Sequence, residues 1–416
     1  MRFSRLAALA GVLLLTACGG EYPQSSIAPA SDFAHRIQDL YFQIFLWTMG
    51  ILAVVWIVLT YILVRFREKP DSPEPEQIHG HLGLEIAWTI VPALIVVAIA
   101  VPTIQTTFDT QTPDPDAMVV DVIGHQYWWE FRYPELGGER TANELRLPVD
   151  RPVALRIWSD DVLHSFWVPQ LGGKRDAYPL RAVPEGDDTK YNWIFMTPQE
   201  VGTFMGQCAE FCGQSHAIMG MRVVVESQED FDAWVADWNE GHAEVPAAEE
   251  IAEAELEEEL QEAIPIAEVA ALQDTPQDVQ DAASQEDASQ DTASQDTASQ
   301  DATDSTPVSA EQALIDEGRQ VFQSGLGGCI ACHAVQGTDA AGVIGPNLTL
   351  LGRRSTIAAG WLENTPENLV RWITAPQDIK PGVLMPGVDV AGGNWPATGL
   401  TEDQVRAIAA YLHSLR

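Results

Sequence analysis

The sequence predicts a multidomain protein with a two-helix transmembrane hairpin, an all-β domain and, beyond a long acidic linker, an all-α domain. Two apolar runs, Tyr41 to Val64 and Leu82 to Gln105, are each long enough to cross a bilayer as a helix. From Met118 to Val225 short alternating runs are broken by Gly, Pro and Asp, which predicts an antiparallel sandwich or barrel. Helical patterns return in 309–416.

The N-terminus has the pattern of an export signal. Arg2 and Arg5 precede the apolar run Leu6 to Ala17, which is too short to span a bilayer but typical of a signal-peptide core. We therefore expect 1–17 to be a signal peptide. The Leu-Thr-Ala-Cys sequence that ends at Cys18 resembles a bacterial lipoprotein cleavage box, which predicts lipidation of Cys18. The alternative is ordinary cleavage nearby, with Cys18 discarded.

The membrane hairpin and its preceding segment occupy 18–106. Arg65, Arg67 and Lys69 lie between the two spans, and basic residues of this kind mark the cytoplasmic side. Both ends of the hairpin then face outward. This orientation predicts a multi-pass protein of the bacterial inner (cell) membrane whose later domains lie on the periplasmic or outer side.

Acidic residues dominate one stretch of the chain and supply about half of its net charge of -37. Glu244 to Asp304 holds nineteen acidic residues and no Lys or Arg, with a tandem Ala-Ser-Gln-Asp-Thr repeat in 288–297. Such a composition buries too little apolar surface to order itself, so we expect 241–308 to be a disordered linker. The charge also excludes nucleic acid as a partner.

The all-β region, 107–240, contains a short segment rich in metal-binding side chains. Cys208, Cys212, His216 and Met219 combine soft sulfur with imidazole, a mixture that suits copper. A mononuclear copper site uses one thiolate, whereas two thiolates can bridge two coppers. The second imidazole must come from elsewhere, and His164, after a strand-like alternation of apolar residues, supplies it.

The remaining ligands and the competing interpretations follow from the same segment. Met219 is the expected weak ligand of one copper and the backbone carbonyl of Glu210 that of the other. A Cys208–Cys212 disulfide is the first alternative, because this segment faces an oxidising compartment, but it does not explain His216 and Met219. Zinc is the second alternative, although structural zinc rarely recruits methionine. His125 is expected to be structural.

With these residues in place, the sequence resembles subunit II of the haem-copper cytochrome c oxidases between Tyr41 and Trp238. That family has a dinuclear copper A centre with a Cys-x3-Cys-x3-His-x2-Met loop and a distant histidine. The resemblance implies a cupredoxin fold for 107–240. It also implies a magnesium ion, shared with subunit I, at the side chain of Glu210.

Two further assignments rest on this resemblance. Glu85 corresponds to a glutamate at the cytoplasmic mouth of a proton path into subunit I, the alternative being a carboxylate that snorkels at the helix end. Tyr127, Trp128 and Trp129 resemble the aromatic stretch above the copper centre, where many members have tryptophan in place of Tyr127. They are candidates for accepting electrons, and buried sheet residues are the alternative.

The C-terminal region, 309–416, carries a haem attachment signature. In Cys329-x2-Cys332-His333 the two thiols form thioethers and the histidine binds iron. Its surroundings resemble class I cytochromes c, which implies an all-α domain of that type. Met385 is the only methionine after Cys332 and is therefore the expected sixth ligand, with His413 as its rival. A redox dithiol is the alternative for the two cysteines.

The resemblance predicts subunit II of a terminal respiratory cytochrome c oxidase, an oxidoreductase and translocase subunit. Electrons from cytochrome c would pass through its own haem c and the dinuclear copper to the oxygen-reducing site in subunit I, coupled to proton pumping. The expected partners are subunits I and III and a donor, either cytochrome c or a quinol–cytochrome c reductase. The alternatives are a copper A-containing partner subunit of a nitric oxide reductase and a stand-alone membrane electron carrier or copper-delivery protein.

Overall fold

The computed structural model describes residues 22–67, 74, 77, 79–180, 190–240 and 308–416. The predicted signal peptide, Cys18, Lys69 and the predicted linker up to residue 307 lie outside the described residues. The chain divides into two compact units, Met1–Asn239 and Glu240–Arg416.

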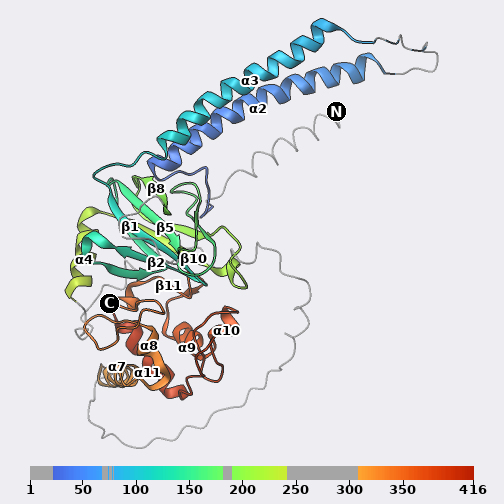
Figure 1. Cartoon of the computed structure of the whole chain (residues 1–416). Coiled ribbons are helices and arrows are strands. Elements are labelled where there is room, and N and C mark those ends of the chain that lie inside the picture. Colours follow the sequence, from blue (N-terminus) through green and yellow to red (C-terminus); the bar gives the residue numbers. More distant parts are fainter. Residues whose placement is uncertain (1–21, 68–73, 75–76, 78, 181–189, 241–307) are drawn as a thin grey trace, which may run out of the picture. The chain divides into compact units, whose positions relative to one another are not determined.

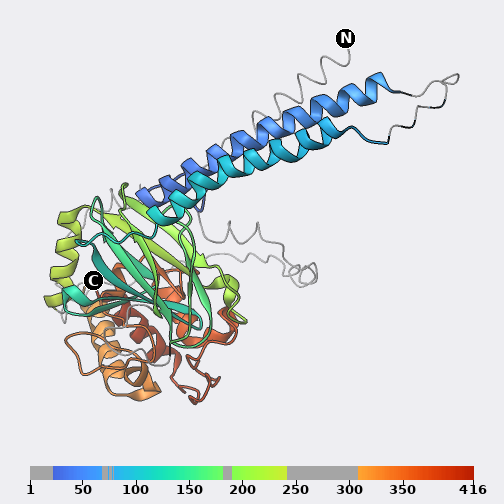
Figure 2. The same ribbon diagram turned by 45° about the horizontal axis from the view of Figure 1, so that its top comes forward.

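Two long helices, α2 (Asp32–Arg65) and α3 (Leu82–Asp109), lie side by side (Figures 1 and 2). Both are long and apolar enough to cross a membrane, and both extend beyond the predicted spans. Their large apolar side chains are mostly exposed, as expected of surfaces that face lipid or another protein. At the start of α3 the His81 imidazole accepts a hydrogen bond from the Leu84 amide, and the Glu85 carboxylate accepts one from the His81 amide at 3.3 Å.

The β domain consists of two five-stranded sheets (Figure 1). The first has the order β3-β2-β1-β5-β8 and the second the order β4-β10-β9-β6-β7. Their bounds are β1 (Met118–His125), β2 (Trp128–Tyr133), β3 (Glu139–Ala142), β4 (Glu144–Pro148), β5 (Val153–Ser159), β6 (His164–Trp167), β7 (Arg175–Ala177), β8 (Asn192–Met196), β9 (Gly202–Cys208) and β10 (Gly220–Glu226). Two 3-10 turns, η1 (Pro134–Leu136) and η3 (His216–Ile218), lie between strands.

The prediction of an antiparallel domain was wrong in one respect, because each sheet contains one parallel pair. β1 runs parallel to β5, and β4 runs parallel to β10. Alternation of apolar and polar residues reports which face of a strand is buried, and it carries no information on the direction of the neighbouring strand. The parallel pairs arise because the strands that intervene in sequence are placed in other positions or in the other sheet.

The inner faces of the two sheets form the core of the β domain. The predicted alternation of Val153, Leu155 and Ile157 is confirmed, since all three side chains are buried in β5. Helix α4 (Gln228–Glu240) closes the domain. Four apolar side chains at helical spacing are expected to pack on the sheet, and of these Phe231, Trp234 and Trp238 are buried whereas Val235 is half-buried.

The segment that precedes α2 is part of the β domain. Ala30 and Ser31 are buried, as is Phe33 in the first turn of α2, and the Ala30 amide donates to the carbonyl of Gln170 at 2.8 Å. The Ser31 hydroxyl donates to the carbonyl of Leu171 at 2.7 Å. The chain is therefore attached to the β domain immediately before it enters the first membrane helix.

The C-terminal unit is helical, with one short hairpin. Its elements are α7 (Val308–Gln323), η4 (Leu326–Gly328), α8 (Cys329–Cys332), η5 (Leu351–Arg353), β11 (Thr356–Ile357), β12 (Leu362–Glu363), α9 (Pro366–Thr374), α10 (Pro376–Ile379) and α11 (Glu402–Ser414). The Thr401 side chain and Gln404 form a reciprocal capping box at the start of α11. Phe322 of α7 and Tyr411 of α11 pack together in the core, with their ring centroids 5.7 Å apart.

Candidate metal centre

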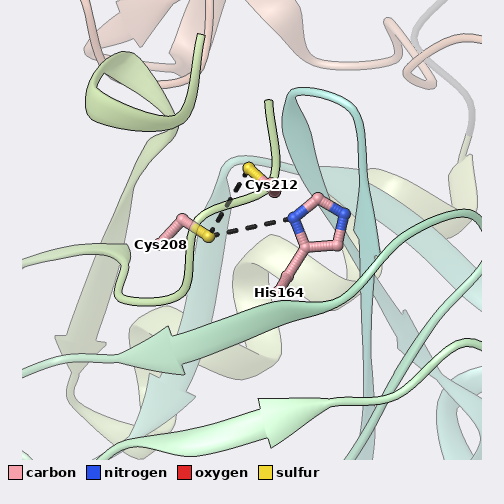
Figure 3. Close-up of side chains that lie close together, drawn as sticks. All are labelled: His164, Cys208 and Cys212. Atoms are coloured by element: carbon pink, nitrogen blue, oxygen red, sulfur yellow. Dashed lines mark hydrogen bonds between the residues drawn. The ribbon is translucent and has the colours of Figure 1, made fainter. Parts of the chain in front are cut away.

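Three of the predicted copper ligands meet at one end of the β domain (Figure 3). His164 begins β6, Cys208 ends β9, and Cys212 lies in the loop between β9 and β10. The Cys208 and Cys212 sulfurs are 3.9 Å apart, and the His164 Nδ1 atom lies 3.8 Å from the Cys208 sulfur. A disulfide requires about 2.05 Å between sulfurs, so Cys208 and Cys212 do not form a disulfide here.

The other predicted ligands surround the same pair of sulfurs. The His216 Nδ1 atom and the Met219 sulfur each lie 3.8 Å from the Cys212 sulfur. The carbonyl oxygen of Glu210 lies 3.2 Å from the Cys208 sulfur. The structure therefore brings together all six donors that the sequence predicted: two thiols, two imidazoles, one thioether and one carbonyl.

Burial and charge favour metal binding at this cluster. Cys208, Cys212, Met219 and His164 are all buried, whereas His216 is half-buried. The pKa of the Cys208 thiol is held well below its usual range, because the adjacent Cys212 thiol and His164 stabilise the thiolate more than burial opposes it. The thiolate is the form that binds metals. This donor set fits copper in both composition and protonation.

The orientation of His164 is fixed by Asp161. The Asp161 carboxylate accepts a hydrogen bond from the Nε2 atom of His164 at 2.8 Å, which leaves Nδ1 directed at the Cys208 sulfur. Burial alone would raise the pKa of Asp161, but hydrogen bonds from His164 and from the amides of Val162 and Gln126 outweigh it and lower the pKa. Carboxylate partners of this kind set the tautomer and direction of a metal-binding imidazole.

The three aromatic candidates occupy different surroundings. Trp129 is fully buried and its ring meets that of His164 edge-on, with centroids 5.8 Å apart. Tyr127 is 5 % exposed, and its hydroxyl accepts a hydrogen bond from the Gln214 amide in the copper loop. Trp128 is half-buried and stacks on His125 at 4.3 Å.

His125 is held by a buried carboxylate in place of a metal. Its Nε2 atom lies 3.0 Å from Glu130, which also binds Arg132 and Arg140. Burial would raise the pKa of Glu130, but hydrogen bonds from His125 and Arg132 prevail and lower it to about 2. These contacts give His125 a structural place in the first sheet.

The haem attachment residues lie at the start of the C-terminal unit. Cys329 and Cys332 begin and end α8 as free thiols, and burial raises the pKa of each. The His333 Nδ1 atom donates to the carbonyl of Pro346 at 2.8 Å, since a carbonyl can only accept. The Nε2 lone pair is then available for iron, and burial keeps the imidazole neutral by lowering its pKa.

Glycine is required beside this histidine. A Cβ atom at Gly345 would lie 2.7 Å from the His333 Cε1 atom, so any side chain there would displace the ring. Cys329 and Met385 pack against the same hydrophobic core, and Gln377 donates to the Met385 carbonyl. The residues present thus fit a covalently attached haem. The rival ligand, His413, lies in the last turn of α11, where burial lowers its pKa.

Comparison with known proteins decides the family. A protein named cytochrome c oxidase subunit 2 from Alkalihalophilus pseudofirmus is 34% identical over 411 residues, which cover 97% of this chain and 94% of that protein. The chain belongs to the cytochrome c oxidase subunit II family. A second protein of that name, from Bacillus sp. (strain PS3), is 30% identical over 435 residues, 99% of this chain and 97% of that protein.

Family profiles account for all three structural parts. Residues 24–106 match the transmembrane domain of cytochrome c oxidase subunit II, 139–228 match its periplasmic domain, and 315–416 match cytochrome c. The predictions of a subunit II family member, of an oxidoreductase subunit and of a membrane hairpin, a cupredoxin-like domain and a helical cytochrome c region are thus confirmed. The chain is a membrane-anchored subunit that works with other haem-copper oxidase subunits, and its domains indicate copper and haem.

Two other similarities cover less of the chain. Quinol oxidase subunit 2 from Bacillus spizizenii is 34% identical over 238 residues, 55% of this chain and 70% of that protein. The crystal structure of the periplasmic domain of subunit II of cytochrome oxidase (CoxB) from Bradyrhizobium japonicum covers 32% of this chain and 100% of that chain, at 26% identity and a TM-score of 0.28.

Several functional residues had no signal in the sequence. Asp161 and the carbonyl of Pro346 contact ligands, and Gln126 contacts Asp161, only after folding, and two of these contacts use backbone atoms. Asp161 stands three residues before His164, but that spacing in a loop predicts no contact. The sequence shows that Glu130 is an acidic residue in a strand-like run. It does not show that Glu130 is buried beside two arginines and His125.

Proposed function

We propose that this chain is the electron-accepting subunit of a terminal respiratory oxidase in a bacterial inner membrane. Electrons from cytochrome c, or from a quinol–cytochrome c reductase, reach its own haem c, then a dinuclear copper centre, and finally the oxygen-reducing site of subunit I. Proton pumping by the complex is coupled to this transfer. Subunit III completes the complex, and the copper and haem domains lie on the periplasmic side.

The observation that carries this proposal is the symmetric arrangement around the two sulfurs. Each sulfur has one imidazole Nδ1 atom 3.8 Å away, His164 beside Cys208 and His216 beside Cys212. Met219 and the Glu210 carbonyl add one weak donor each. Two thiolates, two imidazoles and two weak donors would supply enough ligands to hold two coppers, whereas a mononuclear site would leave one thiolate unused.

The protein supplies ligation and surroundings, and the bound metals supply one-electron redox chemistry. Burial of Cys208 and Cys212 excludes water from the sulfurs. His216 is half-buried beside the exposed ring of Phe211, with ring centroids 5.8 Å apart, and this edge of the site is therefore the accessible one. On the other side the ring of Trp129 meets His164, which supports the aromatic stretch as the route by which electrons arrive.

In the second unit, Cys329 and Cys332 would hold haem c covalently, and His333 and Met385 would bind its iron. Ligation by histidine and methionine raises the potential of haem iron. Tethering the haem domain through 241–307 converts electron delivery into an intramolecular step at an effective concentration of order millimolar. Deleting 241–416 should leave the copper centre intact and slow only the delivery of electrons. Loss of copper from that truncation would contradict independent domains.

The deciding experiment is metal analysis and electron paramagnetic resonance on the full-length chain in its purified complex. We expect two coppers that share one unpaired electron and one low-spin iron per chain. A single copper, or a Cys208–Cys212 disulfide in the active enzyme, would refute the dinuclear centre. Oxygen uptake compared with nitric oxide consumption separates the respiratory oxidase from a nitric oxide reductase, and co-purified subunits I and III exclude a stand-alone carrier.

The outer donor is proposed to be a cytochrome because of the C-terminal unit. The similarity to quinol oxidase subunit 2 covers only 55% of this chain, whereas proteins named cytochrome c oxidase subunit 2 match nearly all of it. Steady-state oxidation of reduced cytochrome c compared with a quinol distinguishes the two donors. Faster oxidation of the quinol would overturn this assignment.

Three individual residues complete the proposal. The Glu210 side chain is half-buried on the loop between the cysteines, and we assign its carboxylate to a magnesium ion shared with subunit I. Glu210→Gln should release that ion and keep the copper, because the carbonyl ligand remains. Glu85 is assigned to proton uptake, tested by the pumping ratio of Glu85→Gln, and Cys18 to lipidation, tested by mass spectrometry of the mature N-terminus.

A further inference from the structure

The two cysteines of the copper centre are held in different ways. Cys208 ends β9, where its amide donates to the Met219 carbonyl and the next amide, of Ala209, donates to Ser165, both at 2.9 Å. Cys212 lies in irregular chain. The turns that follow it are closed by hydrogen bonds from the amides of His216 and Ile218, each 3.2 Å from its acceptor. Contacts from outside the loop also reach this segment.

The turn between β1 and β2 provides those contacts. The Gln126 side-chain amide donates to the carbonyl of Cys212 at 2.6 Å, and the Tyr127 hydroxyl accepts from the amide of Gln214 at 3.1 Å. Gly213 lies between the two bonded residues with φ +131°, and a Cβ atom there would be 2.4 Å from the Tyr127 hydroxyl. Only glycine allows this approach of the loop to the tyrosine.

The same turn also reaches the distant imidazole. The backbone amide of Gln126 donates to one oxygen of the Asp161 carboxylate at 2.5 Å, and the other oxygen of Asp161 accepts from His164 at 2.8 Å. Two adjacent residues of this turn thus contact both the loop that carries Cys212 and the carboxylate that orients His164. These two ligands are far apart in sequence, and the turn contacts both regions.

We propose that Gln126 and Tyr127 are positioning residues that hold Cys212 and His164 in their ligating places before metal binds. The inference rests on the proposed copper function and adds a role to residues otherwise assigned to electron transfer. Cys208 takes its place from the sheet, whereas Cys212 takes its place from this turn. The 3.9 Å spacing of the sulfurs is then a property of the folded chain.

The test uses the full-length chain in its complex with Tyr127→Phe and Gln126→Leu. Tyr127→Phe keeps the ring and removes one hydroxyl that bonds a backbone amide. Each variant should lose copper to a chelator about fivefold faster, the factor that one net hydrogen bond supplies. The copper hyperfine pattern should also change, because the Cys212 sulfur shifts. Tyr178→Phe is the control, since Tyr178 is 51% exposed in the same domain.

A second variant and a metal-free measurement separate the outcomes. Gly213→Ala keeps the tyrosine hydroxyl but pushes it from the loop, and it should reproduce the altered hyperfine pattern. In the copper-free protein, hydrogen exchange at the Gln214 amide should be about fivefold faster in Tyr127→Phe. Copper loss, spectrum and exchange that match those of Tyr178→Phe would overturn the positioning role. A wild-type chain with one copper would overturn the proposed function instead, and the exchange result would still decide the positioning role.

Discussion

Phe33 should determine whether the copper domain is fixed to the membrane hairpin. Its side chain is 3% exposed and lies against Gly172, where a Cβ atom would be only 2.2 Å from the ring. The Arg175 guanidinium lies 5.8 Å from the ring centroid. Gly172 follows β6, the strand that begins with His164. The perturbation is Phe33→Ala, which removes the ring from this contact.

The expected magnitude follows from burial. Replacing a fully buried phenylalanine by alanine costs about 3–5 kcal/mol, because transfer and cavity terms add. We call the contact between Phe33 and Gly172 the joint. If the whole free-energy cost lowers only the stability of the joint against local opening, hydrogen exchange at the joint should accelerate about a thousandfold, at roughly 1.4 kcal/mol per tenfold. The reporting amides are those of Ala30 and Asp32, which donate to Gln170 at 2.8 Å and Thr197 at 3.1 Å.

The assay is hydrogen exchange with mass spectrometry on the full-length chain in lipid nanodiscs. Phe45→Ala is the matched control, because Phe45 is 41% exposed within α2 and its removal should leave the amides of the joint unchanged. An acceleration below about tenfold in Phe33→Ala would refute the reasoning from burial. Equal acceleration throughout the β domain would refute a local joint, since it would place the cost on global unfolding.

Three further outcomes are expected. Asp161→Ala should weaken copper binding about 10- to 100-fold by releasing His164, measured by competition with a chelator, whereas Asp160→Ala at an exposed neighbour should not. Glu130, with a pKa lowered from 4.5 to about 2, should stabilise the β domain by about 3 kcal/mol above pH 4.5 and lose this contribution as pH falls towards 2. Denaturant unfolding of Glu130→Gln should lack that part of the pH dependence. Gly345→Ala should keep covalent haem but reduce the low-spin signal, because the Cβ atom displaces His333.

The ligands of the copper site could be predicted from sequence because they lie in one short segment with fixed chemistry. Cys208, Cys212, His216 and Met219 are local, and the structure brings them together as expected. His164 was predicted by counting donor groups, because two thiolates and one imidazole leave the second copper without an imidazole ligand. The order of apolar runs was likewise sufficient for two long helices and a β-rich domain.

Strand direction and the supporting contacts could not be predicted in this way. The alternation of residues in a strand is the same whether the neighbouring strand runs parallel or antiparallel. The parallel pairs β1–β5 and β4–β10 were therefore not predicted. The segment around Phe33 was assigned to the hairpin because it adjoins an apolar run. Nothing in the neighbouring sequence indicates that Phe33 packs against Gly172. Contacts of Gln126 with Cys212 join residues far apart in sequence, and their formation depends on the packing of both sheets.

The copper centre draws its residues from both sheets, and this has a consequence for its stability. His164 and Cys208 belong to neighbouring strands of the second sheet, where Phe166 of β6 pairs with Cys208. Trp129, which meets His164, and the Gln126–Tyr127 turn belong to the first sheet. Because protein cores transmit strain, a change of volume at an inner-face residue such as Phe166 should shift one sheet relative to the other. Its effect should appear in the copper spectrum as well as in unfolding, although Phe166 is not a ligand.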